Sequence, residues 1–408
     1  MKGTAIMNYS SHDPNRAERL KHAQNLQEQG LRALEQANLP EGLLFIQEAF
    51  LIKVRLLEGE APELNEMVQQ LVDGLVRLER VGEAKNFFAS SIEACSSKSP
   101  QGMYPVGLLV ERVGNVLSGL EQLEAARAWY ALALDAYSCS GGVEDRQVLY
   151  VLQKLVGLTY NLGDLAAAKT YVERVLDLDV KLFGEGHPKV AADLGSLGNI
   201  YQGLGELETA KATYQQAIAI DEASLNLDNP RLAADLNNLA GILEALGDLI
   251  DAKTCRERIL SIEEKTFGPQ HPKVSGDLVE LASLLDRAGD LDGARAALER
   301  ALAIEEQIYG AAHPKTAEVL ASLGSILRRA GELEQAKACL GRALTIEEKH
   351  FGPQHARVAP RLAQLGDVQQ ALGNTQGAKT SYRRALTIYQ LFLPEDDPKI
   401  AALREKVE

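Results

Sequence analysis

Apolar residues along positions 188–229 follow the spacing of two consecutive helices. The first series occupies one helical face and consists of Leu194, Leu197, Ile200, Tyr201 and Leu204. Gly205-Glu206 interrupts it, and a second series follows with Leu207, Ala210, Tyr214, Ala217 and Ile218. Because apolar residues three and four positions apart share one helical face, this pattern predicts an antiparallel helical hairpin.

The hairpin pattern is repeated every 42 residues. An alanine followed by Lys or Arg marks the second helix of each repeat, at Ala84, Ala126, Ala168, Ala210, Ala252, Ala294, Ala336 and Ala378. The turn glycine has the same period, at Gly163, Gly205, Gly247, Gly289, Gly331 and Gly373. A single hairpin cannot bury its own apolar face, whereas a row of hairpins can. The sequence therefore predicts an all-α fold, an α-solenoid of antiparallel helix hairpins.

A second turn connects consecutive repeats and has its own signature. It reads GEGHPKV at 184–190, GPQHPKV at 268–274, GAAHPKT at 310–316 and GPQHARV at 352–358. Proline at the first helical position presets φ and loses no hydrogen bond. The histidines belong to different repeats, about 10 Å apart, whereas zinc ligands lie about 2.0–2.3 Å from one point. We therefore predict structural histidines and no metal site. The lysine after each proline is expected to pair with acids of the preceding helix, such as Glu263 and Glu264.

The repeats divide the chain into four segments. Residues 62–397 hold eight repeats, and residues 20–61 form a ninth, degenerate repeat that caps the N-terminal side. Residues 398–408 are expected to form a C-terminal capping helix with one polar face. Residues 1–19 are expected to be disordered or poorly ordered.

Charge and hydropathy narrow the range of partners. The chain has 43 Lys and Arg against 57 Asp and Glu, a net charge of −14. This balance argues against nucleic-acid binding, which uses a basic surface. No stretch approaches the run of about 18 apolar residues that a transmembrane helix needs. The N-terminus lacks the apolar core of a signal peptide, whether translation starts at Met1 or at Met7. We expect a cytoplasmic protein without membrane insertion.

The sequence contains no recognisable catalytic or cofactor-binding motif: no Walker loop, HExxH, GxSxG, dinucleotide fingerprint or CxxC. Adjacent acids recur on the second helices, as Asp221-Glu222, Glu263-Glu264, Glu305-Glu306 and Glu347-Glu348. Since neighbouring residues of a helix point about 100° apart, we interpret these pairs as a solvated face. Trp129 shares its repeat position with Cys255 and Cys339, which indicates a packing residue. A non-enzymatic protein without cofactor or metal is predicted.

The repeat at 188–229 resembles the tetratricopeptide repeat. Leu197-Gly198 with Tyr201, then Ala210, Tyr214 and Ala217, are similar to its Leu-Gly pair, aromatic residue and Ala-aromatic-Ala series. The 42-residue length, LNNLA at 236–240, RALTIEEK at 342–349 and the FG-x-x-HP junction resemble the kinesin-light-chain type more specifically. The heptads of the kinesin-light-chain coiled coil are not found. The resemblance implies a right-handed superhelix whose first helices line a concave groove for extended or helical peptides.

Four consecutive first helices carry small and polar residues at i, i+3, i+7 and i+10, which lie on one helix face. Eight of these sixteen positions hold Ala, Gly or Ser, which leaves room for a ligand. The candidate peptide-binding residues are Asn199, Gln202, Asn237, Asn238, Glu244, Ser283, Asp286, Glu318, Ser325 and Arg328. Basic ligand groups are expected at Glu244, Asp286 and Glu318, and acidic ones at Arg328 and Arg329. The absence of lysine from this face argues against a clamp for a chaperone C-terminus.

Two interpretations of this face remain open. In the first, it binds a peptide segment of a partner protein, and the chain is a non-enzymatic interaction scaffold, a monomer or a weak homodimer. In the second, the face is merely solvated, and its small residues allow close packing. An alternative function is a structural or self-associating role through the irregular repeats before residue 146.

Overall fold

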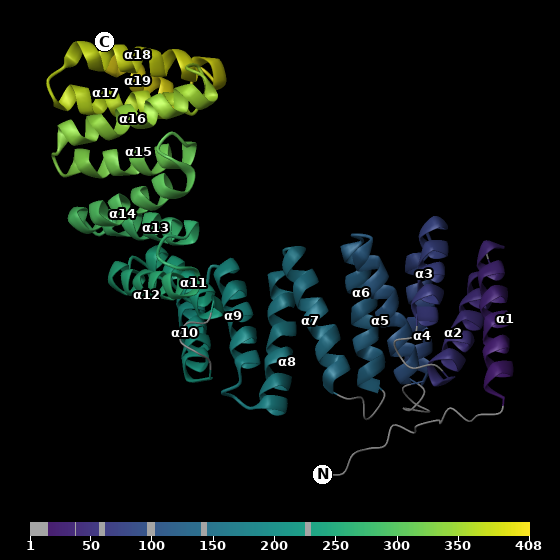
Figure 1. Cartoon of the computed structure of the whole chain (residues 1–408). Coiled ribbons are helices and arrows are strands. Elements are labelled where there is room, and N and C mark those ends of the chain that lie inside the picture. Colours follow the sequence, from purple (N-terminus) through teal and green to yellow (C-terminus); the bar gives the residue numbers. More distant parts are fainter. Residues whose placement is uncertain (1–14, 37, 57–61, 96–102, 140–144, 225–229) are drawn as a thin grey trace. The chain divides into compact units, whose positions relative to one another are not determined.

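The computed structural model describes residues 15–36, 38–56, 62–95, 103–139, 145–224 and 230–408. The described residues form nineteen α-helices and no strand (Figure 1), which confirms the predicted all-α solenoid. The chain divides into two compact units, Met1–Gly205 and Glu206–Glu408, called here the N-terminal and C-terminal units.

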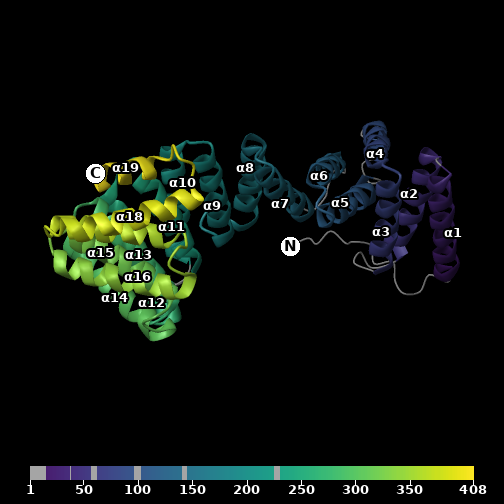
Figure 2. The same ribbon diagram turned by 90° about the horizontal axis from the view of Figure 1, so that it is seen from above.

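The N-terminal unit contains nine helices within its described residues, side by side in chain order (Figures 1 and 2). They are α1 (Arg16–Glu35), α2 (Leu39–Leu56), α3 (Pro62–Arg77), α4 (Val81–Cys95), α5 (Met103–Gly119), α6 (Leu123–Cys139), α7 (Asp145–Asn161), α8 (Leu165–Phe183) and α9 (Pro188–Gly203). Helix α1 begins inside the segment 1–19 that the sequence marks as poorly ordered. Residues 1–14 of that segment lie outside the described residues.

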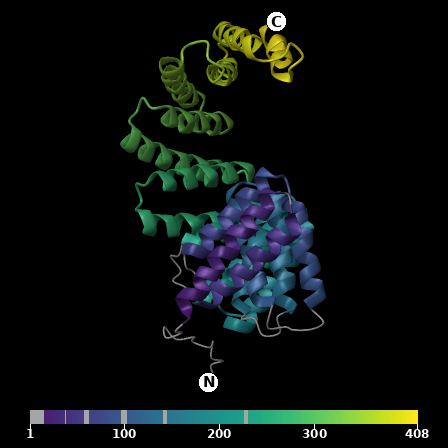
Figure 3. The same ribbon diagram turned by 90° about the vertical axis from the view of Figure 1, so that its right-hand side faces the viewer.

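The C-terminal unit consists of the helix α10, stacked helical hairpins and a final single helix (Figure 3). Its helices are α10 (Leu207–Ser224), α11 (Pro230–Leu246), α12 (Leu249–Phe267), α13 (Pro272–Arg287), α14 (Leu291–Tyr309), α15 (Pro314–Arg329), α16 (Leu333–Phe351), α17 (Val358–Ala371), α18 (Thr375–Phe392) and α19 (Pro398–Val407). Odd-numbered helices from α3 to α17 are the first helices of repeats, and even-numbered helices from α4 to α18 are the second helices. The last helix, α19, buries Ile400 and Leu403, and most of its other residues are exposed.

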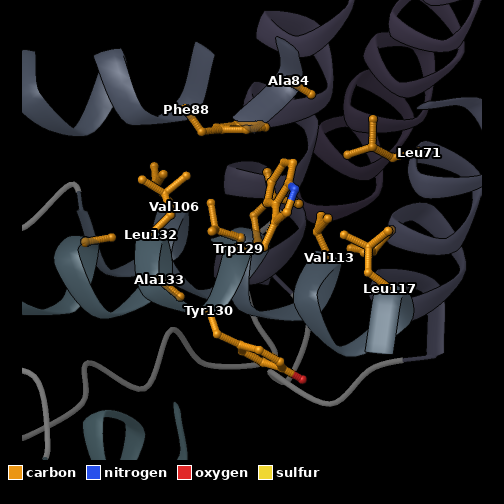
Figure 4. Packing of buried hydrophobic residues seen from close by; sticks show 14 of the residues in the cluster. Leu71, Ala84, Phe88, Val106, Val113, Leu117, Trp129, Tyr130, Leu132 and Ala133 are labelled. Atoms are coloured by element: carbon orange, nitrogen blue, oxygen red, sulfur yellow. The ribbon is translucent and has the colours of Figure 1, made fainter. Parts of the chain in front are cut away.

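Trp129 on α6 lies in the core of the N-terminal unit (Figure 4) and is 1% exposed. Its ring meets Phe88 of α4 edge to face, with the ring centroids 5.8 Å apart. The sequence prediction that Trp129 is a packing residue is therefore confirmed.

The turn inside each of the eight 42-residue repeats is held by a residue with positive φ. The six recurring turn glycines have φ between 77° and 83°. In the irregular repeats Glu79 and Glu121 occupy this position with φ of 57° and 59°. A side chain disfavours this left-handed conformation, so these two turns carry backbone strain that the glycine turns avoid.

The base after the recurring alanine links consecutive repeats at Arg127, Lys211, Lys253 and Arg295. Lys211 on α10 lies 3.2 Å from Asp248, the N-cap of α12, and Arg127 lies 2.9 Å from Asp164 in the same relation. Each of these aspartates also accepts a hydrogen bond from the first turn of its own helix. One carboxylate thus caps a helix and fixes its distance from the previous repeat.

At the turn between repeats, an aromatic ring contacts both a histidine ring and the ammonium group of a lysine. His271 accepts a hydrogen bond at Nδ1 from the Lys273 backbone N–H (3.2 Å), and its ring stacks on Phe267 with 4.8 Å between centroids. The Lys273 ammonium lies 5.1 Å from the same aromatic centroid and 2.6 Å from Glu263. The expected pairing of the lysine with an acid of the preceding helix is confirmed here. His187, His313 and His355 have the same hydrogen bond and the same stacked ring.

The interpretation of the adjacent acids as a solvated face is wrong for the first acid of each pair. Asp221, Glu263, Glu305 and Glu347 are between 1% and 6% exposed. They are buried because the following first helix packs against this face, and in three of the four junctions a described base there meets the acid. The second acids are half-buried and pair with an arginine of the next second helix, as in Arg300 to Glu264 (2.6 Å).

Candidate functional site

The predicted site residues lie on first helices, but they are divided between the two units. Asn199 and Gln202 are on α9 of the N-terminal unit. The other eight lie in the C-terminal unit, on α11 (Asn237, Asn238, Glu244), α13 (Ser283, Asp286) and α15 (Glu318, Ser325, Arg328). The face of α11, α13, α15 and α17 in the C-terminal unit is called here the first-helix face.

A pocket of about 380 Å³ opens on the first-helix face between α13 and α15. Its apolar lining comes from Val279, Ala282, Leu298, Ala321 and Ile326. Its polar lining comes from Glu280, Ser283, Asp286, Ser322, Ser325, Arg361 and Gln364. Three predicted site residues, Ser283, Asp286 and Ser325, therefore share one concavity. An apolar base under a polar rim suits one aliphatic side chain and the backbone that carries it.

The three acids proposed to receive basic ligand groups are already paired within the chain. Glu244 lies 3.0 Å from Arg256 and also accepts a hydrogen bond from Arg287. Arg329 donates to Asp286, and Arg357 lies 3.2 Å from Glu318. Arg329, which was expected to be available for acidic ligand groups, is thus engaged. The carboxylates are neutralised locally, so a basic ligand has to compete with an arginine at each position.

The pairing of acid and arginine along the first-helix face ends at α15. Glu244 of α11 receives Arg287 from α13, and Asp286 of α13 receives Arg329 from α15, in each case 43 residues away. At the next step Arg328 takes the place of the acid and Ala371 takes the place of the arginine. Arg328 is exposed and forms no ion pair with the other described residues of 230–408. It is a positive group on the rim of a face whose other charges are balanced.

Other polar groups of the first-helix face form hydrogen bonds between neighbouring helices or within α17. Arg256 donates to the Asn237 side-chain oxygen over 2.8 Å. Gln364 of α17 donates to Ser325 over 3.2 Å, and Arg361 donates to the Gln364 oxygen over 3.0 Å. Ser283 is exposed at the mouth of the pocket.

Sequence reasoning missed Arg361 of the pocket lining and also three polar residues that share one repeat position, Glu280, Ser322 and Gln364. They lie one, two and three periods of 42 residues after Asn238. Only Asn238 was predicted at this repeat position. Extending the 42-residue period from Asn238 would have identified the three later residues.

The N-terminal unit contains a different polar cluster on its own first helices. Asn115 on α5, two periods of 42 residues before Asn199, accepts hydrogen bonds from Tyr130 (2.7 Å) and Tyr150 (3.0 Å). Tyr137 donates to Glu111 over 2.6 Å, and burial raises the pKa of the Glu111 carboxyl. Tyr130 shares its repeat position with Tyr214, whereas Tyr137 and Tyr150 stand where the repeat at 188–229 has Asp221 and Ala192. The pattern of that repeat therefore did not reveal the whole cluster.

Two searches of the described part of the chain were negative. None of its helices has the length and apolar character to cross a bilayer. Nor do its His, Cys, Asp and Glu side chains form a group of three or more suited to a metal ion.

The fold and the first-helix face define an α-solenoid repeat protein. The sequence profile of the tetratricopeptide repeat matches residues 145–223, 231–304, 278–349 and 316–390. The chain therefore belongs to the tetratricopeptide repeat family, as the motif resemblance implied. Proteins of this family are generally protein-interaction modules, and the repeats of this chain have that architecture. A search of curated proteins found no match.

Several solved structures are similar to this chain at low sequence identity. A putative kinesin light chain from Podosopora anserina with nearly identical TPR-like repeats has 23% identity and a TM-score of 0.45; the match covers 51% of this chain and 99% of that chain. BtubC (BKLC) from P. vanneervenii has 20% identity and a TM-score of 0.44, over 57% of this chain and 95% of that chain. The apo form of RapI has 14% identity and a TM-score of 0.47, over 92% of this chain and 97% of that chain.

Proposed function

We propose that the C-terminal unit binds a peptide segment of a partner protein on its first-helix face, without catalysis. The observation that carries the proposal is the pocket between α13 and α15, because it brings residues of four different helices to one concavity. An extended peptide would place one aliphatic side chain on Val279, Ala321 and Ile326. Its backbone would exchange hydrogen bonds with Ser283 and Ser325 at the rim.

The charges of the face favour an acidic group beside that aliphatic side chain. Arg328 occupies the repeat position that holds an acid in the two preceding repeats. It lies one helical turn from Ser325 on α15. The acids Glu244, Asp286 and Glu318 already have arginine partners, and an exposed pair such as Arg357 with Glu318 is worth about 0–1 kcal/mol. A peptide carboxylate at Arg328 displaces no such partner.

Peptide selection on the purified full chain tests the proposal even though the partner is unidentified. Peptides from a random displayed library are selected, synthesised, and titrated calorimetrically against the wild type and variants. We expect Ser283→Trp, which fills the mouth of the pocket, to weaken binding at least about tenfold, equivalent to about 1.4 kcal/mol. Arg328→Glu is expected to weaken peptides that contain Asp or Glu and to leave neutral peptides unchanged.

The matched control is Ser261→Trp, which makes the same substitution at an exposed serine of the second helix α12. It should bind the selected peptides like the wild type. Selected peptides whose affinity is unchanged by Ser283→Trp, or lowered equally by Ser261→Trp, would show that the pocket is not the binding site.

A further inference from the structure

The four junctions from α10/α11 to α16/α17 each bury a carboxyl group from a second helix. Glu263 of α12 is 1% exposed and lies 2.6 Å from the Lys273 ammonium of α13. Asp221 of α10 is equally buried, 3.4 Å from Arg231 of α11. With one base for one acid, such a junction is an approximately neutral pair, and the base offsets part of the cost of burying the carboxylate.

Two of the junctions contain a second acid. Asp235 of α11 and Asp277 of α13 occupy one repeat position, 42 residues apart. The same position holds Val319 in α15 and Arg361 in α17, where Arg361 lies 3.0 Å from the buried Glu347. The α10/α11 and α12/α13 junctions therefore have a surplus carboxyl group, whereas the α14/α15 and α16/α17 junctions do not.

The surplus carboxyl groups are incompletely hydrogen-bonded. Asp235 is 8% exposed, and its Oδ2 atom has no hydrogen-bond partner among the described residues. The same holds within the described chain for Oδ2 of the half-buried Asp277 and for Oε2 of its neighbour Glu263. A buried carboxylate without a partner is unfavourable, and a bound proton removes the charge.

The charged groups around each acid set the direction of its titration. Burial raises the pKa of Asp235 to about 6, with Asp221 adding to the shift and Arg231 opposing it. Burial likewise raises the pKa of Asp277 to about 6; Glu263 and Glu280 add to this shift, while Lys273 and Arg256 oppose it. In each junction the opposing bases do not outweigh burial and the second acid.

We propose that the α10/α11 and α12/α13 junctions are proton-binding joints that tighten on mild acidification, while the α14/α15 junction, with Val319 in place of the second acid, lacks this response. An acid with a raised pKa in the folded state stabilises that state fully below its unfolded pKa of about 3.9. This stability is lost as the pH rises from about 4 to about 6, and no further change follows above about 6. The joints are thus loosest at neutral and alkaline pH.

Carbon-detected NMR titration of the aspartate carboxyl groups in the full chain tests the proton sites directly. Asp235→Asn and Asp277→Asn assign the two resonances. We expect both midpoints near 6. Midpoints of about 4 or below for both, the ordinary range for aspartate, would overturn the proposal.

Hydrogen exchange tests whether protonation stabilises the junction. Substitutions that remove or add the second acid test whether that acid is the cause. Protection factors of α12 and α13 should rise about fivefold between pH 6 and pH 5, because an acid with a folded pKa near 6 is already half protonated at pH 6. Asp277→Val, which copies the residue of α15, should abolish this rise.

Val319→Asp should create the same pH-dependent rise in α14 and α15, where the wild type has none. Val319→Asn is the matched control, since it introduces a polar side chain that does not titrate. Equal pH responses of Val319→Asp and Val319→Asn, or an unchanged response of Asp277→Val, would contradict the proposal.

Discussion

Replacement of Glu79 and Glu121 by glycine is expected to stabilise the N-terminal unit. Both residues have positive φ, 57° and 59°, at turns where six regular repeats have glycine. The left-handed conformation costs a residue with a side chain about 1–2 kcal/mol. Glycine adds about 0.5–1 kcal/mol of conformational entropy to the unfolded chain, which opposes the gain. The net stabilisation is about 0.5–1 kcal/mol for each turn.

The side chains of Glu79 and Glu121 are exposed, so their removal loses little packing. Because the turns belong to different repeats, the two effects should add to about 1–2 kcal/mol in the double variant. A change of 1 kcal/mol shifts the midpoint of thermal unfolding by about 2–4 °C for a unit of this size. Trp129 is the only tryptophan of the chain and is buried in this unit, so its fluorescence reports the unfolding of the N-terminal unit alone.

The matched control is Glu124→Gly, three residues after Glu121 and in the first turn of α6. Glycine in a helix is expected to lower the midpoint, since it is about 1 kcal/mol less favourable than a good helix former. If Glu121→Gly also lowers the midpoint, the strain attributed to the left-handed turn is absent and the reasoning is refuted.

Three further changes test particular contacts. Asp290→Ala removes the N-cap of α14 and the partner of Lys253, and it should lower the free energy of unfolding, measured with denaturant, by about 1–2 kcal/mol. The control Asp292→Ala, at a position that does not cap the helix, should lower it by less than about 0.5 kcal/mol. Arg361→Met leaves Glu347 buried without its base and should cost about 3 kcal/mol, most of which Glu347→Leu in the same chain should restore. Burial lowers the pKa of Lys53, so the unfolded chain binds more protons there, and thermal stability should rise from neutral pH toward pH 10 in the wild type but not in Lys53→Met.

The fold follows from the sequence because each repeat is dictated by local chemistry. The turn glycines, the capping acids and the prolines at helix starts act within a few residues, so their spacing predicts helices and turns directly. Trp129 was predicted to pack because it shares a register position with two cysteines, and the structure buries it.

Burial between repeats was harder to predict than the repeats themselves. Glu263 and Glu264 have the same chemistry and are adjacent in sequence. Glu263 is nevertheless buried under α13, while Glu264 pairs with Arg300 at the surface. The difference arises from the rotation of one helix against the next, which the helical period alone does not determine. The adjacent acids were therefore misassigned as a single solvated face.

The candidate site was predicted as a face but not as a network. The positions of Ser283, Asp286 and Ser325 on a common concavity follow the expected helix spacing. The pairing of Asp286 with Arg329 depends on side chains from consecutive repeats, 43 residues apart. Such cross-repeat contacts require the distance between helices, which the sequence does not contain.

The most direct test of the proposed binding face is chemical-shift mapping of a selected peptide on the isotopically labelled full chain. The account predicts that the largest amide shifts fall on α13, α15 and α17, around Ser283, Ser325 and Gln364, and that Ser283→Trp removes them. Shifts that cluster on the second helices, or in the N-terminal unit with the first-helix face unchanged, would contradict it.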